Sequence, residues 1–361
     1  MATKTFRGMK YRRMGHSGLW VSEVGLGLWK WGEPSYDGAR VGEHDGFAIL
    51  DRALELGVSH WDTASSYNQG AGNSERLVGR YFASRGARAR QSVILATKVR
   101  NPVRDPHEMA RQFSPNESGA SRRYLYQAVD DCLRRLQTDW IDVLYHHGPD
   151  LLPDGSWAAP LEETWDAMNS LVQAGKVRYL AVSNRSSTQL DQEQGALQGV
   201  SANPARRIVG VQNHYSLLER PRAAAIGDSA SIEDEAAFLD YLGHAEIGLV
   251  PYFPLAAGML TGRYLRGRMD SDGRLSPESG EGLADRFITE RSLDIVLKLD
   301  EIARRKGCTI PQLAIAWLLT RDVVCSVIAG VTRMEHLEDN AGAPGVSLSP
   351  EELEELDRLT R

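Results

Sequence analysis

The sequence predicts an α/β protein built as one parallel (β/α)8 barrel, the TIM-barrel architecture, and three observations lead to this prediction. Eight short apolar runs alternate with longer amphipathic segments almost to the end of the 361-residue chain. The runs are nearly continuously apolar, which is typical of strands covered on both faces in a parallel sheet. No Gly/Ser-rich or Pro-rich linker divides the chain, and one barrel with insertions accounts for its length. We therefore expect a single domain over residues 1–361.

Strands are expected at the apolar runs and helices where apolar residues recur every three to four positions. The expected strands are residues 21–29, 58–63, 93–99, 141–147, 177–183, 208–214, 248–253 and 326–331. The expected helices are residues 43–56, 74–82, 121–136, 161–173, 188–197, 233–244, 293–306 with 310–319, and 334–340. This repeated order favours a closed barrel over an open doubly wound sheet.

Two segments stand outside the repeat. Residues 10–19 contain a Gly-His-Ser-Gly turn and predict a β-hairpin plug at the N-terminal end of the barrel, and residues 349–359 predict an acidic C-terminal helix on its outside. The segments 100–119, 216–231 and 265–287 follow strands, so we expect them at the C-terminal face, where barrel active sites lie. The last of them is rich in Gly, Ser and Asp, and we expect it to be mobile without ligand.

The composition narrows the class of protein. A hydrophobic content of 42% and a charged content of 25% are typical of a soluble globular chain. The formal net charge of −6 argues against nucleic acid or an anionic membrane as the main partner. The basic start is not followed by an apolar region, so a secretory signal is not predicted and a cytoplasmic location is the default. Cys132, Cys308 and Cys325 are odd in number and lack Cys-x-x-Cys spacing, which favours reduced thiols over disulfides or a zinc site.

Polar side chains stand at the ends of three successive predicted strands. Asp62, Lys98 and His147 are these residues, and Tyr67 follows Asp62 by five positions. A lone Asp at a strand end is more often a turn or helix cap, and a lone Lys is more often solvated. The C-terminal ends of barrel strands meet at one face, however, so the four together predict a catalytic site.

Carbonyl reduction explains why these four residue types belong together. Hydride addition creates an alkoxide, which must be protonated by a group about 3 Å away. Tyrosine, with a pKa of about 10, is a poor acid or base at neutral pH unless a cation shifts that pKa. Lys98 would supply this charge to Tyr67, Asp62 would hold the ammonium, and His147 would donate a hydrogen bond to the carbonyl oxygen.

The doublet His146-His147 leaves a choice, because adjacent strand residues point to opposite faces and periodicity cannot say which one enters the site. A metal site at the doublet is disfavoured, since the two rings diverge and no carboxylate stands at ligand spacing.

The chain resembles the aldo-keto reductase superfamily, and within it the bacterial branch that also resembles potassium-channel β subunits. The matching motifs are Gly25-Leu26-Gly27, Trp61-Asp62-Thr63-Ala64 with Tyr67, Ala96-Thr97-Lys98, Val182-Ser183-Asn184, Gln212-Asn213-His214-Tyr215-Ser216, Pro254-Leu255-Ala256-Ala257-Gly258 and Gly330-Val331-Thr332 with Asn340. The resemblance implies NAD(P)H-dependent reduction of an aldehyde or ketone to the alcohol, with Tyr67 as general acid. It aligns His147, rather than His146, with the catalytic histidine.

A Rossmann cofactor site is disfavoured, because Gly25-Leu26-Gly27 lacks the third glycine of the fingerprint. The resemblance instead implies a nicotinamide dinucleotide across the C-terminal face, with NADPH favoured and NADH possible. Its implied contacts near the nicotinamide are Gly27, Leu28, Trp29, Ser183, Asn184 and Gln212. Those along the ring and pyrophosphate are Tyr215, Phe253, Pro254, Leu255, Ala257, Gly258, Leu260 and Arg263. Those at the adenosine end are Gly330, Thr332, His336, Asp339 and Asn340.

The substrate is expected to lie beside Tyr67 and His147 against an apolar wall of Trp29 and Trp31, whereas Trp61 is expected in the core. An open pocket would admit bulky ketones or aldehydes. Three alternatives stay open: oxidation of a sugar or secondary alcohol, a cofactor-binding regulatory subunit, and a barrel hydrolase that uses a metal. The oligomeric state, monomer or homo-oligomer, also stays open.

Overall fold

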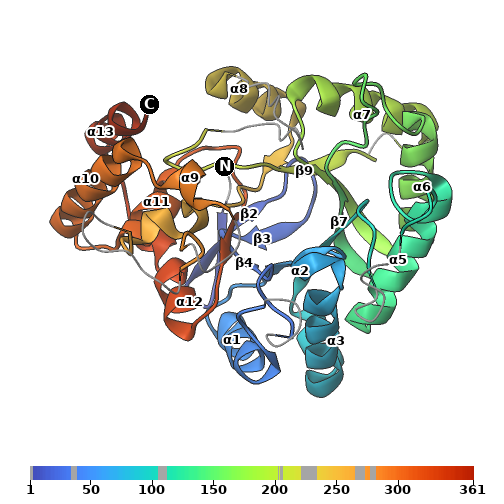
Figure 1. Cartoon of the computed structure of the whole chain (residues 1–361), viewed down its shortest axis with the longest axis horizontal. Coiled ribbons are helices and arrows are strands. Elements are labelled where there is room, and N and C mark those ends of the chain that lie inside the picture. Colours follow the sequence, from blue (N-terminus) through green and yellow to red (C-terminus); the bar gives the residue numbers. More distant parts are fainter. Residues whose placement is uncertain are drawn as a thin grey trace.

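A computed structural model describes residues 3–33, 39–104, 112–201, 203, 206–220, 234–264, 273–276 and 282–361. Eight parallel strands form one sheet in the order β10-β9-β8-β7-β6-β5-β4-β11. The two ends of this order are joined by backbone hydrogen bonds, including Cys325 N–H to Leu249 O (3.0 Å) and Ile328 N–H to Pro251 O (2.9 Å). The sheet therefore closes into an α/β barrel, and Figure 1 shows the helices arranged around it.

The strands lie where the apolar runs predict them. Their bounds are β4 Val24–Gly27, β5 His60–Asp62, β6 Ile94–Val99, β7 Ile141–His147, β8 Val177–Ser183, β9 Ile208–Gln212, β10 Gly248–Leu249 and β11 Val327–Gly330. β7 and β8 have the predicted bounds. The run 21–29, predicted as one strand, forms parts of two. β3 (Trp20–Ser22) belongs to a separate sheet and pairs with β2, and β4 begins after it. The Ser22 hydroxyl donates to Val24 O and accepts from the backbone of Ser59, which marks the break.

All predicted helices are present. Their bounds are α1 Glu43–Glu55, α3 Asn73–Arg85, α5 Arg122–Leu136, α6 Leu161–Gln173, α7 Ser187–Val200, α8 Glu235–Ala245, α10 Glu290–Lys306, α11 Ile310–Leu319, α12 Met334–Ala341 and α13 Pro350–Thr360. Capping boxes begin three of them, at Ser186, Thr309 and Ser349. The short elements α2 Tyr67–Gly70, α4 Ala87–Gln91, α9 Ala284–Phe287, η2 Ala256–Thr261 and η4 Ala343–Gly345 were not predicted. They are too short for a helical period to be recognised.

The N-terminal segment forms a three-stranded antiparallel sheet. β2 (Met9–Arg13) pairs with β3 across the predicted turn, and β1 (Thr3–Phe6) adds a strand that was not predicted. All four residues of β1 are exposed, so no buried face marks it in the sequence. The Met14 side chain is fully buried and packs with Val143 and Ala181 inside the barrel.

The C-terminal helix α13 lies against α10 at the periphery of the molecule (Figure 1), with ion pairs Arg305–Glu355 and Lys306–Glu352 between the two. Trp61 is fully buried, as expected, and its ring stacks on Phe82. None of the helices in the described ranges combines the length and apolar character needed to cross a bilayer. The predicted mobility of the 265–287 segment falls largely on residues outside the described ranges.

Candidate active site

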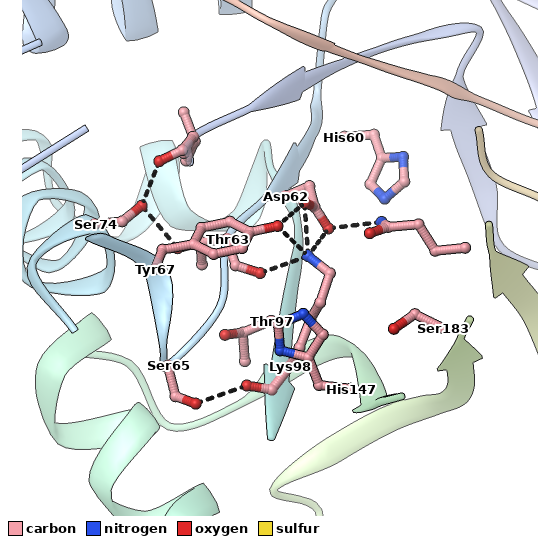
Figure 2. Close-up of polar contacts among 12 residues, drawn as sticks. His60, Asp62, Thr63, Ser65, Tyr67, Ser74, Thr97, Lys98, His147 and Ser183 are labelled. Atoms are coloured by element: carbon pink, nitrogen blue, oxygen red, sulfur yellow. Dashed lines mark hydrogen bonds and ion pairs between the residues drawn. The ribbon is translucent and has the colours of Figure 1, made fainter. Parts of the chain in front are cut away.

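Three of the predicted catalytic side chains form one hydrogen-bonded group (Figure 2). Lys98 Nζ lies 2.6 Å from both carboxylate oxygens of Asp62, 2.8 Å from the Tyr67 hydroxyl and 2.9 Å from Thr63 O. The Tyr67 hydroxyl is also 3.0 Å from Asp62 Oδ2. The His147 ring lies beside this group, with its centroid 6.2 Å from that of Tyr67. The sequence prediction that these four residues lie together agrees with this geometry.

Strand register and the loop after β5 bring the group together. Asp62 ends β5 opposite Ala96 of β6, two residues before Lys98. Side chains two apart on a strand share a face, so Lys98 points to the same side of the sheet as Ala96. The backbone carbonyl of Lys98 accepts hydrogen bonds from the hydroxyl (2.9 Å) and the N–H (3.2 Å) of Ser65. This holds the loop so that Tyr67, the first residue of α2, returns over the strand ends.

Burial decides the protonation states in the group. It raises the pKa of Tyr67 well above the ordinary value, and the neighbouring Asp62 carboxylate raises it further. The sequence predicts that the cation Lys98 shifts this pKa, but burial and Asp62 dominate in the structure. Burial also lowers the pKa of Lys98, an effect that Asp62 opposes. The pKa of His147 lies well below its usual range because of burial and the nearby cations Lys98 and Arg100. Tyr67 is therefore protonated and His147 neutral at pH 7.

The structure separates the two histidines of the doublet. His147 lines the cavity above Tyr67, whereas His146 points the other way into a buried cluster with Arg185 and Glu193. This is the alternation expected of neighbouring strand residues.

A cavity of about 490 Å³ opens over this group and runs to the ends of β11 and α12. Most of the residues predicted from the resemblance line it. These are Gly27, Trp29, Ser183, Asn184, Gln212, Phe253, Pro254, Leu255, Ala257, Gly258, Arg263, Gly330, Thr332, His336, Asp339 and Asn340, together with Asp62, Tyr67 and His147.

Four of the predicted cofactor and substrate contacts do not line the cavity. Leu28 and Leu260 are fully buried in the hydrophobic core. Trp31, predicted as a substrate contact, is also fully buried, and its indole N–H donates to Val331 O at 2.7 Å. Tyr215 packs against Trp317, and its hydroxyl bonds to Glu235. The structure turns these four side chains inward, away from the cavity: Leu28 and Trp31 in the loop after β4, Tyr215 in the loop after β9, and Leu260 in η2 after β10.

Several lining residues were not predicted. Tyr252, Lys30, Arg40, Thr261, Tyr264 and Arg274 are among them. The Tyr252 hydroxyl donates to Asn184 Oδ1 at 2.7 Å, and the Arg274 guanidinium lies 4.4 Å from the Trp29 ring centroid and 4.9 Å from that of Phe253. Basic residues that follow strands of a barrel are a usable signal for Lys30 and Arg274. Tyr252 stands beside Phe253, and no pattern separates the two.

The cavity carries groups that could hold an elongated polar ligand. Asn340 is 2% exposed, and its Nδ2 has no hydrogen-bond partner in the described structure although it faces the cavity wall. A buried amide without a partner indicates that a ligand or water completes the site. Gly258 has a φ of +104° and only one atom within 4 Å of an added Cβ, so backbone can approach a ligand closely there. Arg263, 2.5 Å from His336 Nε2, adds positive charge at the same end.

Comparison of the sequence with known proteins identifies the family of the chain. Residues 23–361 match the family model described as the aldo/keto reductase family. The chain is 31% identical over 353 residues to an L-glyceraldehyde 3-phosphate reductase of Escherichia coli (strain K12), covering 97% of this chain and 92% of that protein. It is 31% identical over 356 residues to a probable voltage-gated potassium channel subunit beta of Arabidopsis thaliana, covering 97% and 96%. It is 29% identical over 364 residues to a versiconal hemiacetal acetate reductase of Aspergillus parasiticus, covering 97% and 96%. The chain therefore belongs to the aldo/keto reductase family.

Proposed function

We propose that the protein is a nicotinamide-dependent oxidoreductase that reduces an aldehyde or ketone to the alcohol, with Tyr67 as the general acid. The observation that carries the proposal is the Tyr67 hydroxyl, held 2.8 Å from Lys98 Nζ at the floor of a cavity that His147 also lines. The hydride for the carbonyl carbon would come from a nicotinamide held in this cavity. The chain supplies the proton, and Tyr67 carries it at neutral pH because its pKa is raised.

The other members of the group have separate roles in this proposal. Neutral His147 donates a ring N–H to the carbonyl oxygen, which orients the substrate and stabilises the developing charge. Lys98 stabilises the tyrosinate left after proton transfer, and Asp62 keeps the buried ammonium charged. Gln212 Nε2 donates to Asp62 Oδ1 at 2.9 Å and so fixes the carboxylate from the opposite wall.

NADPH is the proposed cofactor, with NADH as the alternative. Arg263 and Arg274 line the cavity, and arginines of this kind favour the additional phosphate of NADPH. Ser183, Asn184 and Gln212 offer polar groups for the carboxamide near Tyr67. Asn340 Nδ2, which has no hydrogen-bond partner among the described residues, suits a base at the far end.

The substrate is proposed to lie against an aromatic wall. The Trp29 ring lies 6.3 Å from that of Tyr67 and 5.5 Å from that of Phe253, measured between centroids. Apolar walls of this kind suit an extended or aromatic carbonyl compound. Two relatives are named as reductases, one of a phosphorylated aldehyde and one of a hemiacetal acetate. An assay should therefore include substrates of both kinds.

The test is a panel of carbonyl compounds and alcohols followed at the nicotinamide absorbance, each with NADPH and with NADH. The panel includes glyceraldehyde 3-phosphate, a small neutral aldehyde and a bulky aromatic ketone. We expect reduction with preference for NADPH and no loss of rate with a chelator, which separates this function from a metal-dependent hydrolase. No turnover in either direction with either cofactor would contradict the proposal.

A regulatory subunit that binds the cofactor is the second candidate, and the likeness to a plant channel β subunit over 97% of the chain favours it. It predicts tight binding of the dinucleotide with no substrate-dependent oxidation of it. The same panel, run beside a direct cofactor-binding measurement, distinguishes the two.

A further inference from the structure

A fully buried arginine lies behind the wall of the candidate active site. Arg185 and Glu193 each have 0% side-chain exposure. Arg185 Nε is 2.6 Å from Glu193 Oε2, and its Nη2 is 3.0 Å from Oε1 of the same carboxylate. Nη2 also lies 2.7 Å from His146 Nδ1, and Nη1 donates to Ser183 O at 2.7 Å. One guanidinium therefore ties α7, which carries Glu193, to the ends of both β7 and β8.

The backbone of the same segment is pinned to the end of β9. Arg185 N–H donates to Asn213 Oδ1 at 3.0 Å, and Asn213 Nδ2 donates to Arg185 O at 2.8 Å. The residue before, Asn184, has a φ of +61°, and its N–H donates to Gln212 O at 3.0 Å. Asparagine adopts the left-handed conformation more readily than other non-glycine residues, and the conformation persists where the surroundings hold it. The hydrogen bonds of Arg185 with Asn213 and with Ser183 O supply such surroundings.

The same guanidinium contacts both strand ends that carry cavity-lining residues. His147 pairs with Ser183 in the register of β7 and β8. Arg185 contacts the ends of these two strands on the side away from the cavity. The contacts are to the His146 ring and to the Ser183 carbonyl. An arginine only donates hydrogen bonds, so His146 Nδ1 accepts and carries no proton. A shift of the guanidinium would thus move the backbone on which His147, Ser183 and Asn184 are mounted.

A buried ion pair of this kind is weak evidence for a role in stability alone. Removing two charges from water is unfavourable, and well-packed apolar residues often serve as well. A forked donor with four contacts is, however, well suited to fixing geometry.

We propose that Arg185, held by Glu193, is a positioning residue that fixes the ends of β7 and β8 so that His147, Ser183 and Asn184 face the cavity. The proposal rests on the proposed function for what these three residues contact. It assigns no contact between Arg185 and the ligand.

The test uses the full-length double variant R185M/E193Q, which removes both charges and leaves neither unpaired, so that folding is retained. The matched control is K298M/E301Q, an ion pair on α10 with 60% and 65% side-chain exposure. The first readout is hydrogen exchange of the amides of residues 183–185 without any ligand. We expect exchange there to rise about tenfold in R185M/E193Q and not in the control. This readout does not depend on activity.

The second readout is steady-state kinetics with the best substrate of the panel. We expect kcat/KM to fall about 10²-fold, since small displacements of positioned groups have effects of that size, with kcat falling more than KM rises. R185K retains the charge but not the fork of donors, so it should fold but keep little of kcat. Wild-type exchange at residues 183–185 in the double variant, or full kcat in R185K, would overturn the proposal. If the wild-type protein turns over no carbonyl, the proposed function fails while the exchange result still decides the positioning role.

Discussion

Lys98 Nζ lies 2.6 Å from each carboxylate oxygen of Asp62, and the two side chains are only 1% and 2% exposed. Removing one member of a buried pair of this kind destabilises the fold, because the other charge is left uncompensated. We predict that K98M lowers the free energy of unfolding by about 3–5 kcal/mol, because it leaves the Asp62 carboxylate buried without its cation. Denaturant unfolding measures this. The exposed Lys298 is the matched control, and K298M should change stability by less than about 0.5 kcal/mol.

The double variant D62N/K98M completes this prediction. It should recover most of the stability that K98M loses, because no charge is left buried without a partner. It should not reduce carbonyl compounds, because both Asp62 and Lys98 are replaced. If K98M unfolds at the same denaturant concentration as the wild-type protein, the pair is not buried as described.

Replacing Tyr67 by phenylalanine removes one oxygen and leaves Asp62 and Lys98 in contact. We predict that Y67F binds the dinucleotide with wild-type affinity and folds with a stability change of about 1 kcal/mol. Turnover should fall by about 10²–10⁴-fold, the usual contribution of a general acid. Fluorescence titration with the cofactor and the carbonyl assay measure the two effects. Retention of full turnover in Y67F would exclude Tyr67 as the proton donor.

The two reaction directions should depend differently on pH. Burial and Asp62 hold the pKa of Tyr67 well above the ordinary value, so the phenol stays protonated through neutral pH. Reduction uses the protonated form, and we predict that its rate changes little between about pH 6 and 9. Oxidation needs the deprotonated form, and its rate should rise by about tenfold per pH unit over that range. A reduction rate that falls with an apparent pKa near 8 would show that Lys98 outweighs burial after all.

The sequence predicted the positions of side chains that lie on strands. Asp62 and His147 end strands whose apolar runs are clear, Lys98 is the residue before the end of such a strand, and the closing of a barrel brings these positions together. The prediction failed in the loops, where side-chain alternation stops. Trp29 and Trp31 both follow β4, yet Trp29 lines the cavity and Trp31 is buried against Val331.

The directions of two tyrosines that follow strands could not be predicted from the sequence either. Tyr215 stands three residues beyond the end of β9, and its direction depends on the contact with Glu235 of α8, a residue distant in sequence. Tyr252 follows the two-residue strand β10 and enters the cavity wall instead. No local pattern encodes either outcome, because both depend on tertiary packing.

A buried histidine beneath the site should make the protein sensitive to acid. His60 precedes Asp62 by two residues on β5, is fully buried, and lies 2.9 Å through Nδ1 from Ser326 Oγ. In Figure 2 its ring lies to the upper right of the Asp62 side chain. Burial lowers the pKa of His60 to about 4, whereas an unfolded histidine has a pKa of about 6.5. Between these values the unfolded state binds a proton that the folded state does not.

The stability that neutral His60 provides is therefore complete above pH 6.5 and is lost as the pH falls towards 4. We predict a loss of about 3 kcal/mol from this group across that range, in addition to the contributions of His146 and His147, whose pKa values burial also lowers. Urea unfolding at several values between pH 7.5 and 4.5 measures it. H60N can keep a hydrogen bond to Ser326 but does not titrate, so its stability should fall less steeply than that of the wild-type protein. H44N, at a side chain 99% exposed, should follow the wild-type slope. Parallel slopes for H60N and the wild-type protein would show that folding does not lower the pKa of His60.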